Sequence, residues 1–260
     1  MPKIGLKLWS SNLHYAEEAK KLYDKKIFDY IELSAIPNTF KNTADVWKSL
    51  NIPYIIHAPH FMQGLNFSNK EKESHNMLLA MEAFDFADKL NAKYIIFHPG
   101  IGGDFKETAR QIKKLNDKRI IIENKPYNVA VYEKGLTAND ICVGYSPQQI
   151  KYIAETANIG VCLDIGHCFC AANSIGKDKY EMLNEFLSLK PKMFHISDGD
   201  INSPTDKHYL IGHGSYDFQK IFSLLPKDIT ITLETEKPSK DDLEAFVADS
   251  VNIRKFIQTA

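Results

Sequence analysis

Short apolar segments recur along the whole chain, and stretches with helical spacing separate them. Segments rich in apolar and β-branched residues occur at eight places, which are Lys3–Trp9, Asp29–Leu33, Pro53–His57, Ala92–His98, Arg119–Glu123, Gly160–Asp164, Lys192–Ser197 and Ile229–Glu234. Helical spacing of apolar residues is found between them, for example at Tyr15–Lys25, Glu71–Leu90, Pro147–Asn158, Tyr180–Lys190, Phe218–Leu225 and Asp241–Ile257. The pattern predicts strands and helices that alternate along the chain.

Two architectures share this alternation of strand and helix. A doubly wound open sheet gathers its chemistry at the one point where the order of its strands reverses. A parallel barrel instead brings the carboxyl ends of all its strands to one face. Because side chains of similar chemistry follow six successive segments, we predict an α/β fold of the (β/α)8 TIM barrel class. Since no linker interrupts the repeat, we expect a single metallo-hydrolase domain over residues 1–260.

The composition is that of an ordinary globular protein, with 44% hydrophobic and 25% charged residues. The apolar runs are only a few residues long, and the amino-terminal segment lacks an apolar signal core. We therefore expect a cytoplasmic protein with no membrane partner, and we expect a monomer. The cysteines form no Cys-x-x-Cys pair, so we interpret all four as reduced packing residues.

The formal net charge of −1 gives no argument from bulk electrostatics for a nucleic-acid partner. The only arginines are Arg110, Arg119 and Arg254, and none falls near the predicted active face. No Gly-rich phosphate loop follows the first predicted strand, where the sequence reads Trp-Ser-Ser-Asn from Trp9. We expect no nucleotide cofactor.

Six predicted strands carry a metal-binding side chain at or just after the carboxyl end. These residues are His57, His98, Glu123, Asp164, His195 and Glu234. Taken singly, such a histidine is more often a hydrogen-bonded core or loop residue than a ligand. Glu123 is stronger evidence, because a carboxylate after three isoleucines is costly to desolvate unless a cation or several donors receive it. Their coincidence on one face predicts hydrolytic or Lewis-acid chemistry at bound metal ions.

Two further pairs extend this predicted centre. His167 follows Asp164 by three residues, and we expect Gly166 to allow a tight bend between them. Asp206 and His208 lie two residues apart in the long loop Gly199–Ser215. A second long loop, Asn124–Ser146, follows the fifth predicted strand, and such loops shape the pocket of a barrel enzyme.

Other polar residues near this face have an ordinary interpretation. His60 and His213 fall in loops, where they contact either the substrate or nothing. Lys125 and Lys207 are the nearest basic candidates for holding a phosphate, and a solvated lysine is the alternative for both.

The motifs occur in a characteristic order. They read His-Ala-Pro-His at His57, Phe-His-Pro-Gly at His98, Ile-Glu-Asn at Glu123, Leu-Asp-Ile-Gly-His at Asp164 and His167, His-Ile-Ser-Asp at His195, Asp-Lys-His at Asp206 and His208, and Leu-Glu-Thr at Glu234. Over nearly the whole chain this set resembles endonuclease IV (AP endonuclease family 2), within the xylose isomerase-like TIM barrel superfamily. The resemblance implies a zinc-dependent endonuclease of base-excision repair that cleaves damaged double-stranded DNA on the 5′ side of abasic sites.

The same resemblance implies three Zn2+ ions per chain, although the mixed ligands would also accept Mn2+ or Fe2+. One ion would be held by His57, His98 and Glu123, a second by Glu123, Asp164, His195 and Glu234, and a third by His167, Asp206 and His208. A hydroxide between the first two ions would attack phosphorus, with Glu123 as the catalytic residue that orients it. The third ion would stabilise the leaving 3′ oxygen.

The recognition loops depart from the family pattern. The family presents an arginine after the second strand and a tyrosine after the first ligand histidine. Here the loop Ile36–Lys41 has no arginine, and His60 stands at the tyrosine position. We expect Phe40 or Phe61 to serve as the wedge at a lesion.

An alternative function is that of a divalent-metal-dependent sugar isomerase or epimerase of the same superfamily. Those enzymes resemble this chain only at Glu123, Asp164, His195 and Glu234, often with a histidine like His167. They need one metal ion, with Glu123 and Glu234 as the proton-transfer pair. The Asp206 and His208 pair is therefore the discriminating element.

Overall fold

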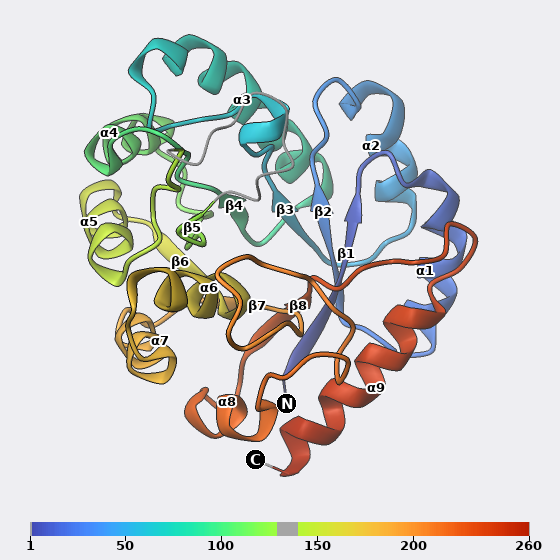
Figure 1. The fold of residues 1–260 in the computed structure, drawn as a ribbon. Coiled ribbons are helices and arrows are strands. Elements are labelled where there is room, and N and C mark those ends of the chain that lie inside the picture. Colours follow the sequence, from blue (N-terminus) through green and yellow to red (C-terminus); the bar gives the residue numbers. More distant parts are fainter. Residues whose placement is uncertain (1, 129–139, 260) are drawn as a thin grey trace.

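The computed structural model describes residues 2–128 and 140–259, and it confirms the predicted (β/α)8 barrel. Eight parallel strands pair in chain order and close on themselves, with β1 beside β8 (Figure 1). The strands are β1 Lys3–Trp9, β2 Tyr30–Ser34, β3 Tyr54–His57, β4 Ile95–Phe97, β5 Ile120–Glu123, β6 Gly160–Asp164, β7 Met193–Ile196 and β8 Thr230–Leu233. Several are one to four residues shorter than the apolar segments that predicted them.

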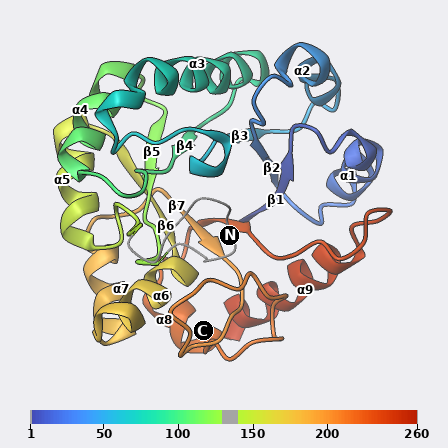
Figure 2. The same cartoon turned by 45° about the horizontal axis from the view of Figure 1, so that its top comes forward.

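A ring of helices surrounds the strands, as the turned view also shows (Figure 2). The α-helices are α1 Ala16–Asp24, α2 Phe40–Ser49, α3 Glu73–Leu90, α4 Phe105–Leu115, α5 Pro147–Ala157, α6 Ile165–Ile175, α7 Lys179–Leu187, α8 Phe218–Leu224 and α9 Glu244–Thr259. Three short 3-10 helices are η1 Leu13–Tyr15, η2 Phe61–Gln63 and η3 Lys70–Lys72. Helices α2, α4 and α6 go beyond the stretches that the sequence singled out. In α6 the first eight residues are all buried, so it has no polar face to reveal it.

Successive side chains of each strand point alternately outward and inward. The outward residues pack against the helices in one large apolar core, which includes Ile56, Phe97, Ile122 and Phe194. The inward residues form a separate apolar layer inside the barrel, made of Tyr30, Ile55, Ile96, Ile121, Cys162 and Met193. This layer fills the barrel and so forms the floor under the residues that follow it.

Two residues beyond each member of this floor, the same alternation brings a polar side chain to the inner surface. Ile55 precedes His57, Ile121 precedes Glu123, and Met193 precedes His195 by this spacing. Since the strands are parallel, these polar side chains share one level at the carboxyl end of the barrel. The fold thus gathers six of the predicted metal ligands from six strands.

The two long loops differ in how much of them is described. Residues 129–139 of the loop Asn124–Ser146 lie outside the described residues. The loop Gly199–Ser215 is described throughout, and its ends meet because Ser215 N donates to Gly199 O at 2.8 Å. In the described ranges, every helix is too short or too polar to cross a bilayer.

Candidate metal centre

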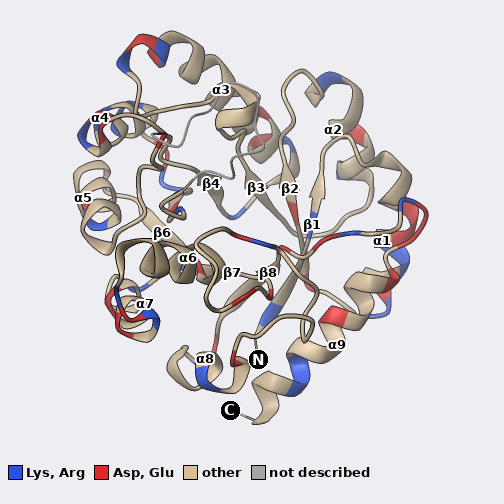
Figure 3. Cartoon of the chain, in the orientation of Figure 1, with Lys and Arg blue, Asp and Glu red and all other residues tan. Residues whose placement is uncertain are grey.

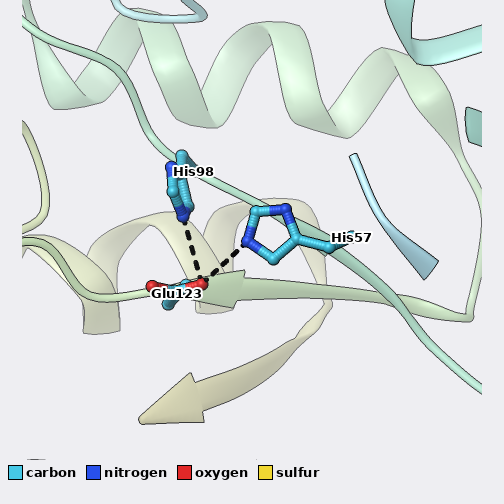
Figure 4. A group of neighbouring side chains, drawn as sticks. All are labelled: His57, His98 and Glu123. Carbon is cyan, nitrogen blue, oxygen red and sulfur yellow. Dashed lines mark hydrogen bonds and ion pairs between the residues drawn. The ribbon is translucent and has the colours of Figure 1, made fainter. Parts of the chain in front are cut away.

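Glu123 lies at the centre of a group of four histidines. Its Oε2 is 3.2 Å from His57 Nε2 and 3.1 Å from His98 Nε2 (Figure 4). The same oxygen is 3.3 Å from His195 Nδ1, and Oε1 is 3.1 Å from His167 Nδ1. The carboxylate is buried at the carboxyl end of β5, so it touches imidazoles from four other elements of the barrel.

Three histidines have their proton position fixed by the backbone. His57 Nδ1 is 2.8 Å from Ala58 O, and His167 Nδ1 is 2.9 Å from Asn124 O. His208 Nδ1 is likewise 2.6 Å from Glu234 O. A carbonyl oxygen only accepts, so each Nδ1 carries a hydrogen, and Nε2 is the nitrogen that can bind a metal ion once it has given up any proton. This arrangement is typical of histidines that bind metal through Nε2.

His167, Asp206 and His208 form a complete third group of donors. Asp206 Oδ2 is 2.8 Å from His208 Nε2 and 3.3 Å from His167 Nε2. The backbone contacts of the two histidines use Nδ1. Their Nε2 atoms therefore both face Asp206 Oδ2. His167 comes from the first turn of α6, whereas the other two residues come from the loop after β7.

Three residues of the predicted second group, Glu123, His195 and Glu234, lie together. His195 Nδ1 is 2.7 Å from Glu234 Oε1 and 3.3 Å from Glu123 Oε2. Asp164, the fourth residue of that predicted group, shares a donor group with Glu123 and His167. Cys162, interpreted from the sequence as a packing residue, does lie in the barrel floor, but its sulfur also lies near Glu123 and His195.

Gly166 does not form the bend that the sequence suggested. It lies inside α6, where Asp164 caps the helix by accepting from His167 N at 2.6 Å. A Cβ atom at Gly166 would lie 3.1 Å from Asp206 Oδ1 and 3.3 Å from Asp164 Oδ1. The glycine therefore provides room for two carboxylates to approach the helix.

The acids and imidazoles of the centre shift each other's pKa. Although burial favours the neutral acid, His98 and His195 hold the pKa of Glu123 well below its usual value. Burial raises the pKa of Asp164 to about 6. Burial disfavours a charged His167, but the Asp164 carboxylate and the contacts with Asp206 and Glu123 together outweigh it, and the pKa of His167 rises to about 10. The centre therefore stabilises positive charge among its carboxylates.

Several donor atoms are buried and unsatisfied. Glu123 Oε1, His195 Nδ1 and Asp206 Oδ2 lie within ion-pair distance of other residues of the centre, but none of them makes a hydrogen bond in the described part of the chain. Burying such polar atoms costs free energy unless a hydrogen-bond partner or a metal ion binds them. Each belongs to a residue of a His, Cys or carboxylate group whose donor atoms lie within 4.8 Å of one another. The residues present fit divalent metal ions of the kind that His and carboxylate ligands bind.

The predicted substrate-binding residues differ in how near they lie to the donor groups and in how free their side chains are. His60 lies beside the first group, its ring 6.0 Å from that of His98, and burial and the nearby Lys125 lower its pKa to about 3. Lys207 is exposed beside Asp206. Phe40 is not a free wedge, because it begins α2 and packs edge-on against Phe86 at 5.0 Å. Phe61 begins η2, next to His60.

Sequence reasoning missed two residues at the same level of the barrel, Lys7 and Glu32. Both are inward residues of their strands, two positions beyond Gly5 and Tyr30. Lys7 Nζ is 3.2 Å from Glu32 Oε1, and it also forms an ion pair with Glu234. The sequence does contain a sign of them, because each is a charged residue within an apolar strand. Each also falls at an inward position, as the six predicted ligands of the strand ends do.

Asp198 organises the loop that supplies Asp206 and His208. Its buried carboxylate accepts four backbone N–H groups, at 2.8 to 3.2 Å, from Gly199, Gly212, Gly214 and Tyr216. The two ends of the loop are therefore held by one side chain.

We expect Asp198→Ala to lower the free energy of unfolding by about 3 kcal/mol, because four backbone donors, two of them buried, lose a charged acceptor. Urea unfolding of the metal-free protein measures this change. Asp200→Ala is the matched control, since Asp200 is exposed in the same loop. Equal stability of the two variants would contradict the role of Asp198.

Comparisons with known proteins agree with this fold. A family model described as xylose isomerase-like TIM barrel matches residues 15–254. A protein of Metamycoplasma arthritidis named probable endonuclease 4 is 26% identical over 215 residues, covering 75% of each chain. Endonuclease IV from Thermus thermophilus has a TM-score of 0.68 at 19% identity and covers 100% of both chains. A D-tagatose 3-epimerase-like protein has a TM-score of 0.72 at 17% identity, covering 98% of this chain and 97% of its own.

The two structural likenesses show the shared barrel, and they include an endonuclease and an epimerase-like protein. The similarity to endonuclease IV expected from the motifs is found again in a sequence relative that bears this name. The family match spans nearly all of the barrel, from η1 to α9. The chain belongs to the xylose isomerase-like TIM barrel family.

Proposed function

We propose that this chain is a zinc-dependent phosphodiesterase of endonuclease IV type, which cleaves DNA on the 5′ side of abasic sites. The observation that carries this proposal is the complete third donor group, His167, Asp206 and His208. A sugar isomerase or epimerase needs one metal ion and has no use for this group. Three cations, by contrast, suit a phosphodiester that gains charge during cleavage.

We assign the ligands as three sets. They are His57, His98 and Glu123; then Glu123, Asp164, His195 and Glu234; and then His167, Asp206 and His208. Metal ions bound there would neutralise the phosphodiester and supply an activated water as nucleophile. Glu123 belongs to two sets, and its two oxygens face different histidines, so it fixes the spacing between them.

The proton positions of the centre support the same chemistry. His57, His167 and His208 each donate Nδ1–H to a backbone carbonyl, so their Nε2 atoms are aimed before any ligand arrives. The low pKa of His60 keeps that imidazole neutral at physiological pH, so it adds no charge beside the first group. The side chains are thus preorganised for cations and for an anionic substrate.

Lys125 supports an anionic substrate. It follows β5 by two residues and is only 8% exposed, with its backbone N–H bonded to Gly144 O. Its charge lowers the pKa of His98 and of His60, after the larger effect of burial, so its ammonium group lies near the first donor group. No carboxylate of the described residues lies within ion-pair distance of it. A phosphodiester oxygen would be a suitable partner for this ammonium group.

The charge distribution also bears on the DNA partner. Lysines and acidic residues are interspersed around the outer helices (Figure 3). Attraction of DNA would therefore come from the centre and its nearby lysines, and not from a uniformly basic face. This suits recognition of one lesion more than tight binding along undamaged DNA.

The test is cleavage of a labelled duplex that contains one abasic-site analogue, beside an undamaged duplex. Protein loaded with zinc is compared with protein stripped by a chelator, and bound metal is counted per chain. We expect a metal-dependent nick only on the 5′ side of the lesion and about three metal ions per chain.

Two other outcomes would redirect the assignment. Fully loaded protein that leaves the lesion uncut contradicts the nuclease function. One tightly bound manganese or magnesium ion per chain, together with turnover of a small sugar, would establish the isomerase or epimerase alternative.

A further inference from the structure

Glu32 is a fully buried carboxylate beside the second donor group, yet it belongs to none of the three proposed ligand sets. It is 0% exposed at the middle of β2. Its Oε2 lies 2.9 Å from His195 Nε2 and accepts from Thr232 Oγ1 at 2.7 Å. Its Oε1 faces Lys7 Nζ at 3.2 Å. Burying an ionised carboxylate costs free energy because it loses its hydration. Its presence here therefore points to a role in the site.

The contact with Glu32 sets which nitrogen of His195 is free. A carboxylate only accepts, so His195 Nε2 carries the hydrogen that points to Glu32. Nδ1 is then left to face Glu234 and Glu123, at 2.7 and 3.3 Å. The backbone fixes His57, His167 and His208, whereas His195 is fixed by a side chain.

A short chain of hydroxyl groups fixes Glu32 in turn. Thr232 Oγ1 uses its hydrogen on Glu32, so Tyr30 OH, 2.8 Å away, must donate to Thr232. Both residues are buried and inward-facing, on β2 and β8. All members are inner residues of closed barrel strands, so none can turn away without disturbing the floor.

Lys7 balances the charge of Glu32. Its ammonium group contacts both Glu32 and Glu234. A dication bound at Glu234 would neutralise the charge of that carboxylate. Lys7 would then remain as the counter-ion of Glu32. The negative charge behind His195 is therefore compensated with and without metal.

We infer that Glu32 is a positioning residue for the second metal ion: it orients His195 through Nε2, with Lys7 as its counter-ion. The inference rests on the metal chemistry proposed above. A carboxylate behind a ligand histidine also makes that ligand more basic. Removing the charge of Glu32 should weaken the binding of one metal ion and leave the others bound.

The test is a direct measurement of metal binding by Glu32→Gln. Zinc affinity is measured for each site by competition with a chromophoric chelator, and Co2+ is used as a spectroscopic probe of ligand geometry. We expect one ion per chain to bind about 10- to 100-fold more weakly. The Co2+ spectrum of that ion should change, and Glu32→Asp should recover part of the affinity.

Glu73→Gln is the matched control, since Glu73 forms an ion pair with Arg110 on the outer helices. Should Glu32→Gln fail to fold, Thr232→Val tests the same arrangement by removing one donor to Glu32, with weaker binding of the same ion expected. Unchanged affinities and spectra in a folded variant would overturn the inference. Wild-type protein that binds no metal would instead overturn the proposed function.

Discussion

Glu123→Gln should reduce cleavage at an abasic site by about 1,000-fold or more, because one substitution removes a negative charge shared by two donor sets. Glutamine has nearly the same shape, so the buried position at the end of β5 is still filled. The lost charge would leave His98 and His195 without the carboxylate that they now face. Single-turnover cleavage by zinc-loaded protein measures the effect.

The fold of this variant is checked by urea unfolding of the metal-free protein. Glu73→Gln serves again as a control, since it makes the same chemical change on an outer helix. We expect the control to cleave at the wild-type rate. Undiminished cleavage by Glu123→Gln would remove the basis for placing Glu123 at the centre of the reaction.

Asp206→Asn should reduce cleavage by about 100- to 1,000-fold, the scale expected for losing one principal electrostatic contribution to the transition state. Asp206 Oδ2 is the atom on which His167 Nε2 and His208 Nε2 converge. An asparagine keeps the shape but lacks the charge that attracts a cation. The count of tightly bound metal ions should fall by one per chain, as elemental analysis after dialysis would show.

Asp200→Asn tests the charge alone, because Asp200 is an exposed carboxylate in the same loop. It should retain both the metal count and the cleavage rate. If Asp206→Asn also retained them, the third donor group would have no part in the reaction. The main structural support for a nuclease would then be lost.

The sequence predicts the barrel and six of the nine clustered residues from local rules, whereas His167 lies in α6 and Asp206 and His208 lie in a loop, where no strand rule places them. Strand alternation places inner residues at a fixed phase, and closure of a parallel barrel brings strand ends together. His57, Glu123 and His195 can therefore be found by position alone, without knowledge of any contact between them. Their roles as metal ligands remain predictions.

Features that depend on packing are beyond such rules. The sequence places Phe40 in a loop, but contact with Phe86 fixes it at the start of α2. The sequence suggests a bend at Gly166, whereas the role of this glycine comes from carboxylates supplied by distant segments. Lys7 and Glu32 escape a rule that selects residues at the strand ends, because these two lie before the end of β1 and β2.

The loop Gly199–Ser215 is closed at its base by Asp198 and by the bond between Ser215 and Gly199. It carries two of the three proposed ligands of the third set, and it contributes none of the barrel strands. If the proposed ligand sets are right, exchanging this one loop would change the number of metal ions that the same eight strands can hold.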